Sequence, residues 1–414
     1  MESPRPTDSR PRAPGAAGPL SGVRVVDLTW MLAGPYCTML LADLGADVIK
    51  VEPPGGDPMR QTGPFVEDDD LQAFGGYFQS VNRNKRSVVL NLKAEDDRDR
   101  FFALARSADV VVENFRAGVM DRLGVGYESL AVLNPRLVYG AIRGFGDPRT
   151  GESPYAARPA VDVTIQAMAG MMGITGPGEG HPLKSGPGVG DIFPGTLCAL
   201  GIAAALLHAR STGEGQFVDV AMYDGILSLC ERIVYQHSYT GEVPVPQGNT
   251  HPIFCPFDIF PTSDGHVALD ATADAAWRKL AIAMDRSELG TDPRYAEAAA
   301  RAERSTEVRE LVSSWMLTRT SAEVEDALAA DIPVGSVNTV REIFSDPHVA
   351  ARDMIVDVEQ PGVERPVRIA GSPIKLTGTP GGVQTRAPLL GEHSSEILSE
   401  LGQGVDEVEL SRRG

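Results

Sequence analysis

From Leu20 onward, short apolar runs alternate with stretches of helical periodicity, and this alternation limits the folds that the chain can adopt. Helical stripes cover residues 36–44, directly after Pro35, and residues 96–106. The apolar runs have the length and near-continuous character of buried strands, and they cover residues 23–28, 46–51, 87–92, 110–113 and 137–142. Because parallel strands need helical crossovers of this kind, the pattern predicts an α/β fold, with a doubly wound parallel sheet.

A second region does not continue the alternation of strands and helices. The Pro- and Gly-rich segment 241–256 indicates a boundary, and residues 257–269 then resemble a hairpin that turns at Ser263-Asp264-Gly265. A chain of 414 residues is also too long for one ordinary core. We therefore expect a disordered tail at 1–19, a large α/β domain from 20–225 and 335–414, and a smaller α+β domain at 240–330.

Charge and composition exclude several functional classes. The formal net charge of -18 disfavours general binding to nucleic acid or to anionic membranes. The first nineteen residues lack the apolar centre of a secretory signal, and we predict a cytoplasmic protein. Four scattered cysteines form no CxxC pair, so neither a metal site nor a disulfide framework is expected.

The first strand–helix junction, residues 28–35 (LTWMLAGP), holds one glycine and one proline. It is not a GxGxxG fingerprint, and the chain contains no GxxxxGK[ST] loop, which disfavours a dehydrogenase with a permanently bound dinucleotide. Basic residues gather at 82–86 (NRNKR), Lys93, Arg116 and Arg122. Their donors suit a ligand with several phosphates, while a solvated charged surface is the alternative that composition leaves open.

A series of short motifs gives the chain a family resemblance. They are LSGVRVVDL (20–28), AGP (33–35), LGADVIKVE (44–52), NKRS (84–87), ENFR (113–116), NPRL (134–137), GEGQFVDV (213–220) and GEH (391–393). In this order they resemble class III CoA-transferases of the CaiB/BaiF type, from about residue 20 to about residue 400. The resemblance implies an interlocked homodimer. It also implies acyl-CoA and a small carboxylic acid as substrates, with coenzyme A as a substrate rather than a resident cofactor.

The resemblance also implies a nucleophile. In family transferases such as formyl-CoA transferase, an Asp follows a stretch of small residues and precedes a helix that leads to a GxGQ turn. Here the matching residues are Gly188-Val189-Gly190-Asp191. Asp191 would attack the thioester and pass through an aspartyl anhydride and an aspartyl–CoA thioester. Taken alone, the residues leave open that Asp191 merely caps a helix.

Contacts with CoA follow from the resemblance position by position. Leu32 and Ala33 match the loop that borders the thioester. The residues that match the nucleotide-binding segments are Leu90, Asn91, Leu92, Lys93, Asn114, Phe115, Arg116 and Arg122. Two positions depart from the family pattern, because Pro53 and Pro159 stand where relatives carry basic residues. Arg60 is the candidate replacement for one of them.

The same fold also hosts α-methylacyl-CoA racemases, which pair a His with the later Asp. Here the His position is Val161, which carries no proton, so the racemase is disfavoured. Asp162 remains beside it, and we expect it to contact CoA, to orient the site or to cap the helix that begins at Val163. A CoA-binding protein without turnover and a purely structural dimer are the non-enzyme alternatives, and Asp191 among its glycines disfavours both.

The acid pair is left open by the sequence. Thr164, Gln166 and Ser185 are small polar residues near the predicted site, and with the loop at 248–251 they favour a small polar acid, such as a dicarboxylic acid. We also predict that this loop shields the anhydride from water.

Overall fold

The computed structural model describes residues 18–402, so residues 1–17 of the predicted tail lie outside the described residues. Contacts divide the described chain into two compact units. The first contains residues 18–171, 185–235 and 348–402, and the second contains residues 172–184 and 236–347. The second unit therefore takes in a segment that lies before residue 240 and extends past residue 330, in contrast to the predicted boundaries.

The first unit is built on a sheet of six parallel strands in the order β3-β2-β1-β4-β5-β6. The strands are β1 (Arg24–Asp27), β2 (Asp47–Glu52), β3 (Lys85–Val89), β4 (Val110–Glu113), β5 (Val138–Arg143) and β6 (Phe217–Ala221). The chain runs outward from β1 to β3 and then returns to the other side of β1 with β4. The predicted doubly wound parallel sheet is confirmed.

Helices cover both faces of this sheet because successive strand residues point in opposite directions. In β1, Val25 packs on the face covered by α1 and α8, and Val26 packs on the face covered by α3 and α5. The helices of this unit are α1 (Ala33–Asp43), α2 (Gly76–Asn82), α3 (Glu95–Ser107), α4 (Val119–Arg122), α5 (Tyr127–Leu133), α6 (Asp162–Met168), α8 (Val189–Thr212), α9 (Met222–Leu229) and α17 (Ser394–Glu400), with a 3-10 turn at Pro58–Gln61.

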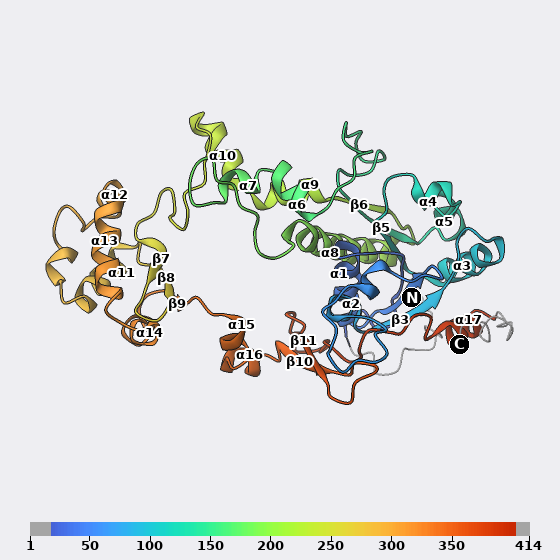
Figure 1. Cartoon of the computed structure of the whole chain (residues 1–414). Coiled ribbons are helices and arrows are strands. Elements are labelled where there is room, and N and C mark those ends of the chain that lie inside the picture. Colours follow the sequence, from blue (N-terminus) through green and yellow to red (C-terminus); the bar gives the residue numbers. More distant parts are fainter. Residues whose placement is uncertain (1–17, 403–414) are drawn as a thin grey trace, which may run out of the picture. The chain divides into compact units, whose positions relative to one another are not determined.

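Helices α1 and α8 run side by side on one face of the sheet (Figure 1). A side chain at Gly195 of α8 would place its Cβ only 2.5 Å from the carbonyl oxygen of Ala33, so glycine permits the close approach. Among the described helices, α8 is the one whose length and apolar composition would suit a membrane span. It packs against α1, α9 and strands β5 and β6, as a core helix does.

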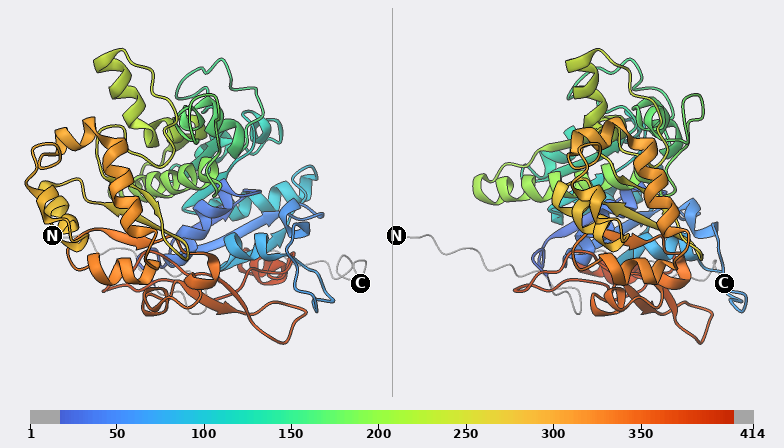
Figure 2. Two further views of the ribbon diagram at one scale, coloured as in Figure 1. Left: turned by 60° about the vertical axis from the view of Figure 1, so that its left-hand side comes forward. Right: turned by 90° about the vertical axis from the view of Figure 1, so that its left-hand side faces the viewer.

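The C-terminal segment returns to the first unit. It forms the antiparallel pair β10 (Ile355–Val358) and β11 (Val367–Ala370), and α17 then lies beside β3. Figure 2 shows this red helix next to the blue strands of the N-terminal half. Arg86 of β3 donates to Glu400 of α17 over 2.8 Å, which ties the two ends of the chain together.

The second unit contains an antiparallel sheet in the order β7-β8-β9. The predicted hairpin is confirmed, since β7 (Phe257–Pro261) and β8 (His266–Asp270) pair around the expected turn, and β9 (Val334–Ser336) adds a third strand. Its helices are α11 (Asp274–Ala283), α12 (Ala298–Glu303), α13 (Ser305–Met316), α14 (Ser321–Leu328) and α15 (Val340–Ile343), with a 3-10 turn at Ser287–Gly290. Three further helices, α7 (Met171–Ile174), α10 (Glu231–Thr240) and α16 (Pro347–Ala351), cross the boundaries between the units.

Candidate active site

Strands β1 and β4 are parallel neighbours, but the strands that follow β1 are added on one side of it and those that follow β4 are added on the other side. The loops after β1 and β4 therefore lead away from each other at this point. In open α/β sheets, ligands bind beyond the carboxyl ends of the strands at such a switch point. The loop after β1 leads into α1, and α1 packs on α8, which carries Asp191. The sheet topology therefore puts the predicted nucleophile and the predicted thioester loop on neighbouring helices.

Asp191 is half-buried in the first turn of α8. The helix begins at Val189 with Gly188 as its N-cap residue, and Gly188 has no side chain with which to cap it. The cap interpretation of Asp191 is therefore wrong, because the residue lies inside the helix. Burial raises the pKa of Asp191 to about 7, and the negative charge of Asp162 adds to the effect.

Asp162 begins α6, and its carboxylate points to the start of α8. Its Oδ1 atom accepts hydrogen bonds from the backbone N–H of Gly190, at 2.7 Å, and from the side-chain amide of Gln166, at 2.8 Å. The N-cap residue of α6 is Val161, so Asp162 does not cap its own helix. Of the predicted roles, the geometry fits that of orienting the site.

Gln166 extends this connection. Its side chain is fully buried, and its Oε1 atom accepts from the backbone N–H of Ser185 at 2.9 Å. The series Asp162, Gln166 and Ser185 thus joins α6 to both ends of the segment that precedes Asp191. Hydrogen bonds that run through a buried side chain in this way restrict the position of the segment that leads to Asp191.

Tyr77, in the first turn of α2, is a site residue that the sequence did not indicate. Burial raises the pKa of its phenol, and the charges of Asp191, Asp57 and Asp162 raise it further. The phenol therefore stays protonated, within electrostatic range of the predicted nucleophile. No motif surrounds Tyr77, and only the packing of α2 brings it to this place.

Leu32 and Ala33, the predicted thioester neighbours, form the start of α1. A Cβ atom added at Gly188 would lie 3.0 Å from Cδ2 of Leu32 and 3.9 Å from Cγ of Asp162. Leu32 therefore reaches the N-terminal end of α8, three residues before Asp191, as the predicted role requires.

The predicted nucleotide contacts follow strands β3 and β4 at the same edge of the sheet. Lys93, Arg116 and Arg122 are exposed, and within residues 18–402 none of them forms an ion pair, so their charges are available to phosphate groups. Leu90 is different, because only 2% of its surface is exposed and it packs in the core. The remaining predicted contacts, Asn91, Leu92, Asn114 and Phe115, are half-buried.

The basic side chains of the run at residues 82–86 are buried and paired with carboxylates of the protein. Arg83 makes a two-pronged ion pair with Asp43, and Lys85 pairs with Asp27 in the core at 3.0 Å. Arg86 pairs with Asp47 at 2.7 Å. For Arg83, Lys85 and Arg86 these contacts fit neither a phosphate-binding role nor a solvated surface, because their acidic partners come from elements distant in the sequence, whereas Lys93, Arg116 and Arg122 of the same basic set are exposed.

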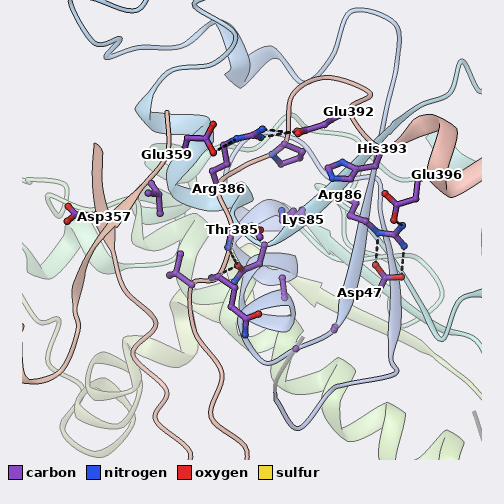
Figure 3. Close-up of a pocket in the computed structure, with 18 residues that line it drawn as sticks. Asp47, Lys85, Arg86, Asp357, Glu359, Thr385, Arg386, Glu392, His393 and Glu396 are labelled. Carbon is purple, nitrogen blue, oxygen red and sulfur yellow. Dashed lines mark hydrogen bonds and ion pairs between the residues drawn. The ribbon is translucent and has the colours of Figure 1, made fainter. Parts of the chain in front are cut away.

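Lys85 and Arg86 line a cavity of about 530 Å³ at the amino ends of β2 and β3, the sheet edge opposite the candidate site. Figure 3 shows that its charged side chains face one another, as in the pairs Arg86–Asp47 and Arg386–Glu392. In these pairs each basic group is neutralised by a carboxylate of the protein.

Arg60 also has a structural role. Its guanidinium binds both carboxylate oxygens of Glu52, donates to the carbonyl of Pro388 and lies 4.0 Å from the centre of the Phe78 ring. With 3% of its surface exposed, it does not replace the missing phosphate contact. Within residues 18–402, no three His, Cys, Asp or Glu side chains are grouped closely enough to hold a metal ion.

Comparisons with known proteins agree on one family. Residues 20–394 match the family model described as CoA-transferase family III. The chain is 52% identical over 391 residues to a succinyl-CoA:mesaconate CoA-transferase of Haloarcula hispanica, covering 94% of this chain and 98% of that protein. It is 39% identical over 398 residues to a succinate–glutarate CoA-transferase of Agrobacterium fabrum, covering 94% and 97%. A CaiB/BaiF family protein from Brucella suis has a similar structure, with a TM-score of 0.82, 35% identity, and coverage of 93% and 100%.

Proposed function

Because the chain belongs to CoA-transferase family III and is a CoA-transferase, we propose that it moves CoA between short dicarboxylic acids, with succinyl-CoA as donor and mesaconate or a related unsaturated diacid as acceptor. Several similar relatives bear names that specify dicarboxylic acids, including mesaconate and glutarate. The observation that carries the mechanism is the half-buried carboxylate of Asp191, held at the start of α8 beside Asp162.

In the first half-reaction, the Asp191 carboxylate attacks the thioester carbonyl of the donor. The C–S bond breaks, CoA leaves as its thiolate, and a mixed anhydride joins the donor acyl group to Asp191. The thiolate then attacks the aspartyl carbonyl. This step releases the donor acid as a carboxylate and leaves CoA bound to Asp191 as a thioester.

The second half-reaction runs the same steps in reverse with the acceptor. The acceptor carboxylate attacks the aspartyl–CoA thioester and releases the thiolate. The thiolate then attacks the acyl carbon of the acceptor, which forms the new acyl-CoA and regenerates the Asp191 carboxylate. The reaction consumes no water. Water that reached the anhydride or the aspartyl–CoA thioester would hydrolyse it and waste the donor, so the site has to exclude water. Shielding by the loop at 248–251, in the second unit, stays a prediction.

The raised pKa of Asp191 suits this chemistry. A carboxylate with high proton affinity is a stronger nucleophile, and with a pKa of about 7 it is still largely ionised at mildly alkaline pH. Asp162 contributes the nearby negative charge, and Tyr77 contributes a neutral phenol. Val161 is 52% exposed and holds no titratable group at the position where a racemase carries its His, which supports transfer over racemisation.

The proposal is tested by trapping the covalent intermediate. The protein is incubated with succinyl-CoA and treated with hydroxylamine, and the peptide that contains Asp191 is analysed by mass spectrometry. We expect a hydroxamate at Asp191 that depends on the acyl-CoA, and an unmodified peptide with acetate in place of succinyl-CoA. Turnover with mesaconate but no modification at Asp191 would reject the mechanism. If none of the dicarboxylic acids tested accepted CoA, the proposed substrate class would be rejected.

We also propose a homodimer, as the family resemblance implies. Apolar side chains stand exposed on the outer side of α8, among them Leu200 at 67% and Leu207 at 72%. Monomeric proteins seldom expose such side chains on a helix that is otherwise apolar. Sedimentation equilibrium is expected to give twice the mass of the 44.1 kDa chain. A single-chain mass at micromolar concentration would contradict the proposal.

A further inference from the structure

We propose that the side chain of Asn114 is a positioning group, which holds the loop between β1 and α1 in its working conformation instead of binding CoA itself. The side-chain amide of Asn114 is occupied on both sides. Its Oδ1 atom accepts from the backbone N–H of Trp30 at 2.9 Å, and its Nδ2 atom donates to the backbone carbonyl of Trp30 at 2.7 Å. Asn114 therefore pairs with Trp30 much as a neighbouring strand would, and bridges the two loops at the switch point of the sheet.

The loop needs this support because its next residue is strained. Met31 has a φ of 69°, in the left-handed region that side chains other than glycine seldom adopt. This conformation is unfavourable for an L-residue, and the surrounding contacts have to offset its cost. Met31 is 46% exposed, so its own side chain supplies little packing to hold it. The contacts that fix the turn must come from its neighbours.

The residue before Trp30 is already fixed by buried charges. The carbonyl of Thr29 accepts from Nζ of Lys50 at 2.6 Å, while the N–H and hydroxyl of Thr29 donate to Asp27. Helix α1 fixes the other side of the turn from Ala33 onward. Asn114 binds the backbone of Trp30, which lies between Thr29 and the start of α1, directly before the turn at Met31.

The position of Asn114 is itself rigid. The next residue, Phe115, donates its backbone N–H to Glu113 at 2.6 Å and accepts from Arg143 at 3.3 Å. The Phe115 ring also meets the Trp30 ring edge to face, with centroids 5.4 Å apart. A stiff partner is what a residue needs if it is to hold a strained neighbour in place.

The loop leads directly to the reacting centre. Leu32 follows Met31 and reaches Gly188, at the start of the helix that carries Asp191. A shift in the turn at Met31 would move Leu32 away from the start of α8. We therefore infer that Asn114 acts on the chemical step through the loop. A direct ligand would act on the affinity for CoA instead.

This difference is measurable. The inference rests on the proposed transfer reaction, and it is tested in Asn114→Ala with succinyl-CoA and mesaconate. We expect kcat to fall on the order of 30-fold, the effect of losing two hydrogen bonds, while KM for succinyl-CoA stays within about threefold. Asn114→Asp keeps the acceptor and loses the donor, so its kcat should be intermediate. A rise in KM at unchanged kcat would identify Asn114 as a CoA ligand and overturn the inference.

A second variant uses the strain. Glycine adopts a φ near 69° without cost, so Met31→Gly in the Asn114→Ala background is expected to recover kcat on the order of fivefold. The gain is partial because glycine also reaches other conformations. Absence of any recovery would show that the Trp30–Met31 turn is not what Asn114 controls.

A readout without turnover separates this inference from the proposed function. Hydrogen exchange at the Trp30 N–H should quicken in Asn114→Ala, because its acceptor is lost. Asn134→Ala is the matched control, since Asn134 also holds a backbone carbonyl, that of Ala108, at 2.8 Å and lies away from the site. It should leave both kcat and the exchange of Trp30 unchanged. Unaltered exchange at Trp30 in Asn114→Ala would overturn the inference even if no substrate were turned over.

Discussion

Replacing Asp191 by Asn is expected to lower kcat/KM by on the order of 10³–10⁴-fold, because a neutral amide is a poor nucleophile toward a thioester. Binding of acyl-CoA should persist, since the exposed cations Lys93, Arg116 and Arg122 are not altered. Steady-state kinetics and equilibrium binding of succinyl-CoA together test this. An Asn variant that keeps a tenth of the wild-type rate, with its sequence verified at position 191, would exclude Asp191 as the nucleophile.

The same substitution is expected to stabilise the fold at alkaline pH. The pKa of Asp191 is about 7 in the folded protein, above the value of about 3.9 for an unfolded chain. A raised pKa means that the folded state binds the proton more tightly, so stability is present at low pH and is lost as the pH rises toward 7. The Asn variant carries no such ionisation.

Urea unfolding at pH 5.5 and at pH 8 measures this effect. The variant should be more stable than the wild type, and the difference should be larger at pH 8. Asp99→Asn, at an exposed position on α3, is the control and should show no difference between the two pH values. If the difference in stability between the Asn variant and the wild type were smaller at pH 8 than at pH 5.5, the raised pKa of Asp191 would be contradicted. The same ionisation should appear in the wild type as a fall in kcat/KM below about pH 7.

Replacing Arg60 by Met is expected to lower the free energy of unfolding by about 3–5 kcal/mol, because it leaves the buried carboxylate of Glu52 without its partner. Glu52 is fully buried and accepts from Arg60 through both oxygens. Its pKa lies below the usual range despite burial, which opposes the shift, because Arg60 and Lys50 favour the charged form. Chemical denaturation measures the loss.

Two further variants make this result specific. Adding Glu52→Gln to Arg60→Met removes the uncompensated charge, so the pair should lose less stability than Arg60→Met alone. Arg365→Met is the surface control, since Arg365 is 63% exposed and its ion pair with Asp68 should contribute less than about 1 kcal/mol. If Arg60→Met weakened CoA binding at unchanged stability, Arg60 would be a phosphate ligand after all.

The sequence predicted the parts of the fold that depend on local pattern. In the run at residues 110–113, three consecutive valines cover both faces, as is typical of a buried parallel strand, and β4 was predicted with its bounds. Asp191 was predicted as the nucleophile because its neighbours match a family motif, and this role stays a prediction. The boundaries near residues 172–184 were not predicted, although that segment is rich in Gly and Pro, because nothing in a short Gly- and Pro-rich run shows that it leaves one unit and joins another.

The errors at the charged residues have one physical cause. Arg83 and Lys85 are neutralised by Asp43 and Asp27, each of which lies some forty or more positions earlier in the chain. A run of basic residues has the same pattern whether its partners are phosphates, water or distant carboxylates. For Tyr77 and Asn114, only the folded chain shows that one phenol lies near the nucleophile and that one amide is occupied by Trp30.

The close contact at Gly195 limits how this enzyme is able to change. The smallest side chain there would collide with the carbonyl of Ala33, one residue after Leu32. A substitution would therefore push α1 away from α8, and the displacement would begin at the candidate active site. Efforts to widen the range of acids that the enzyme accepts should therefore leave Gly195 unchanged. At this position, a change in side-chain size also changes the spacing between α1 and α8.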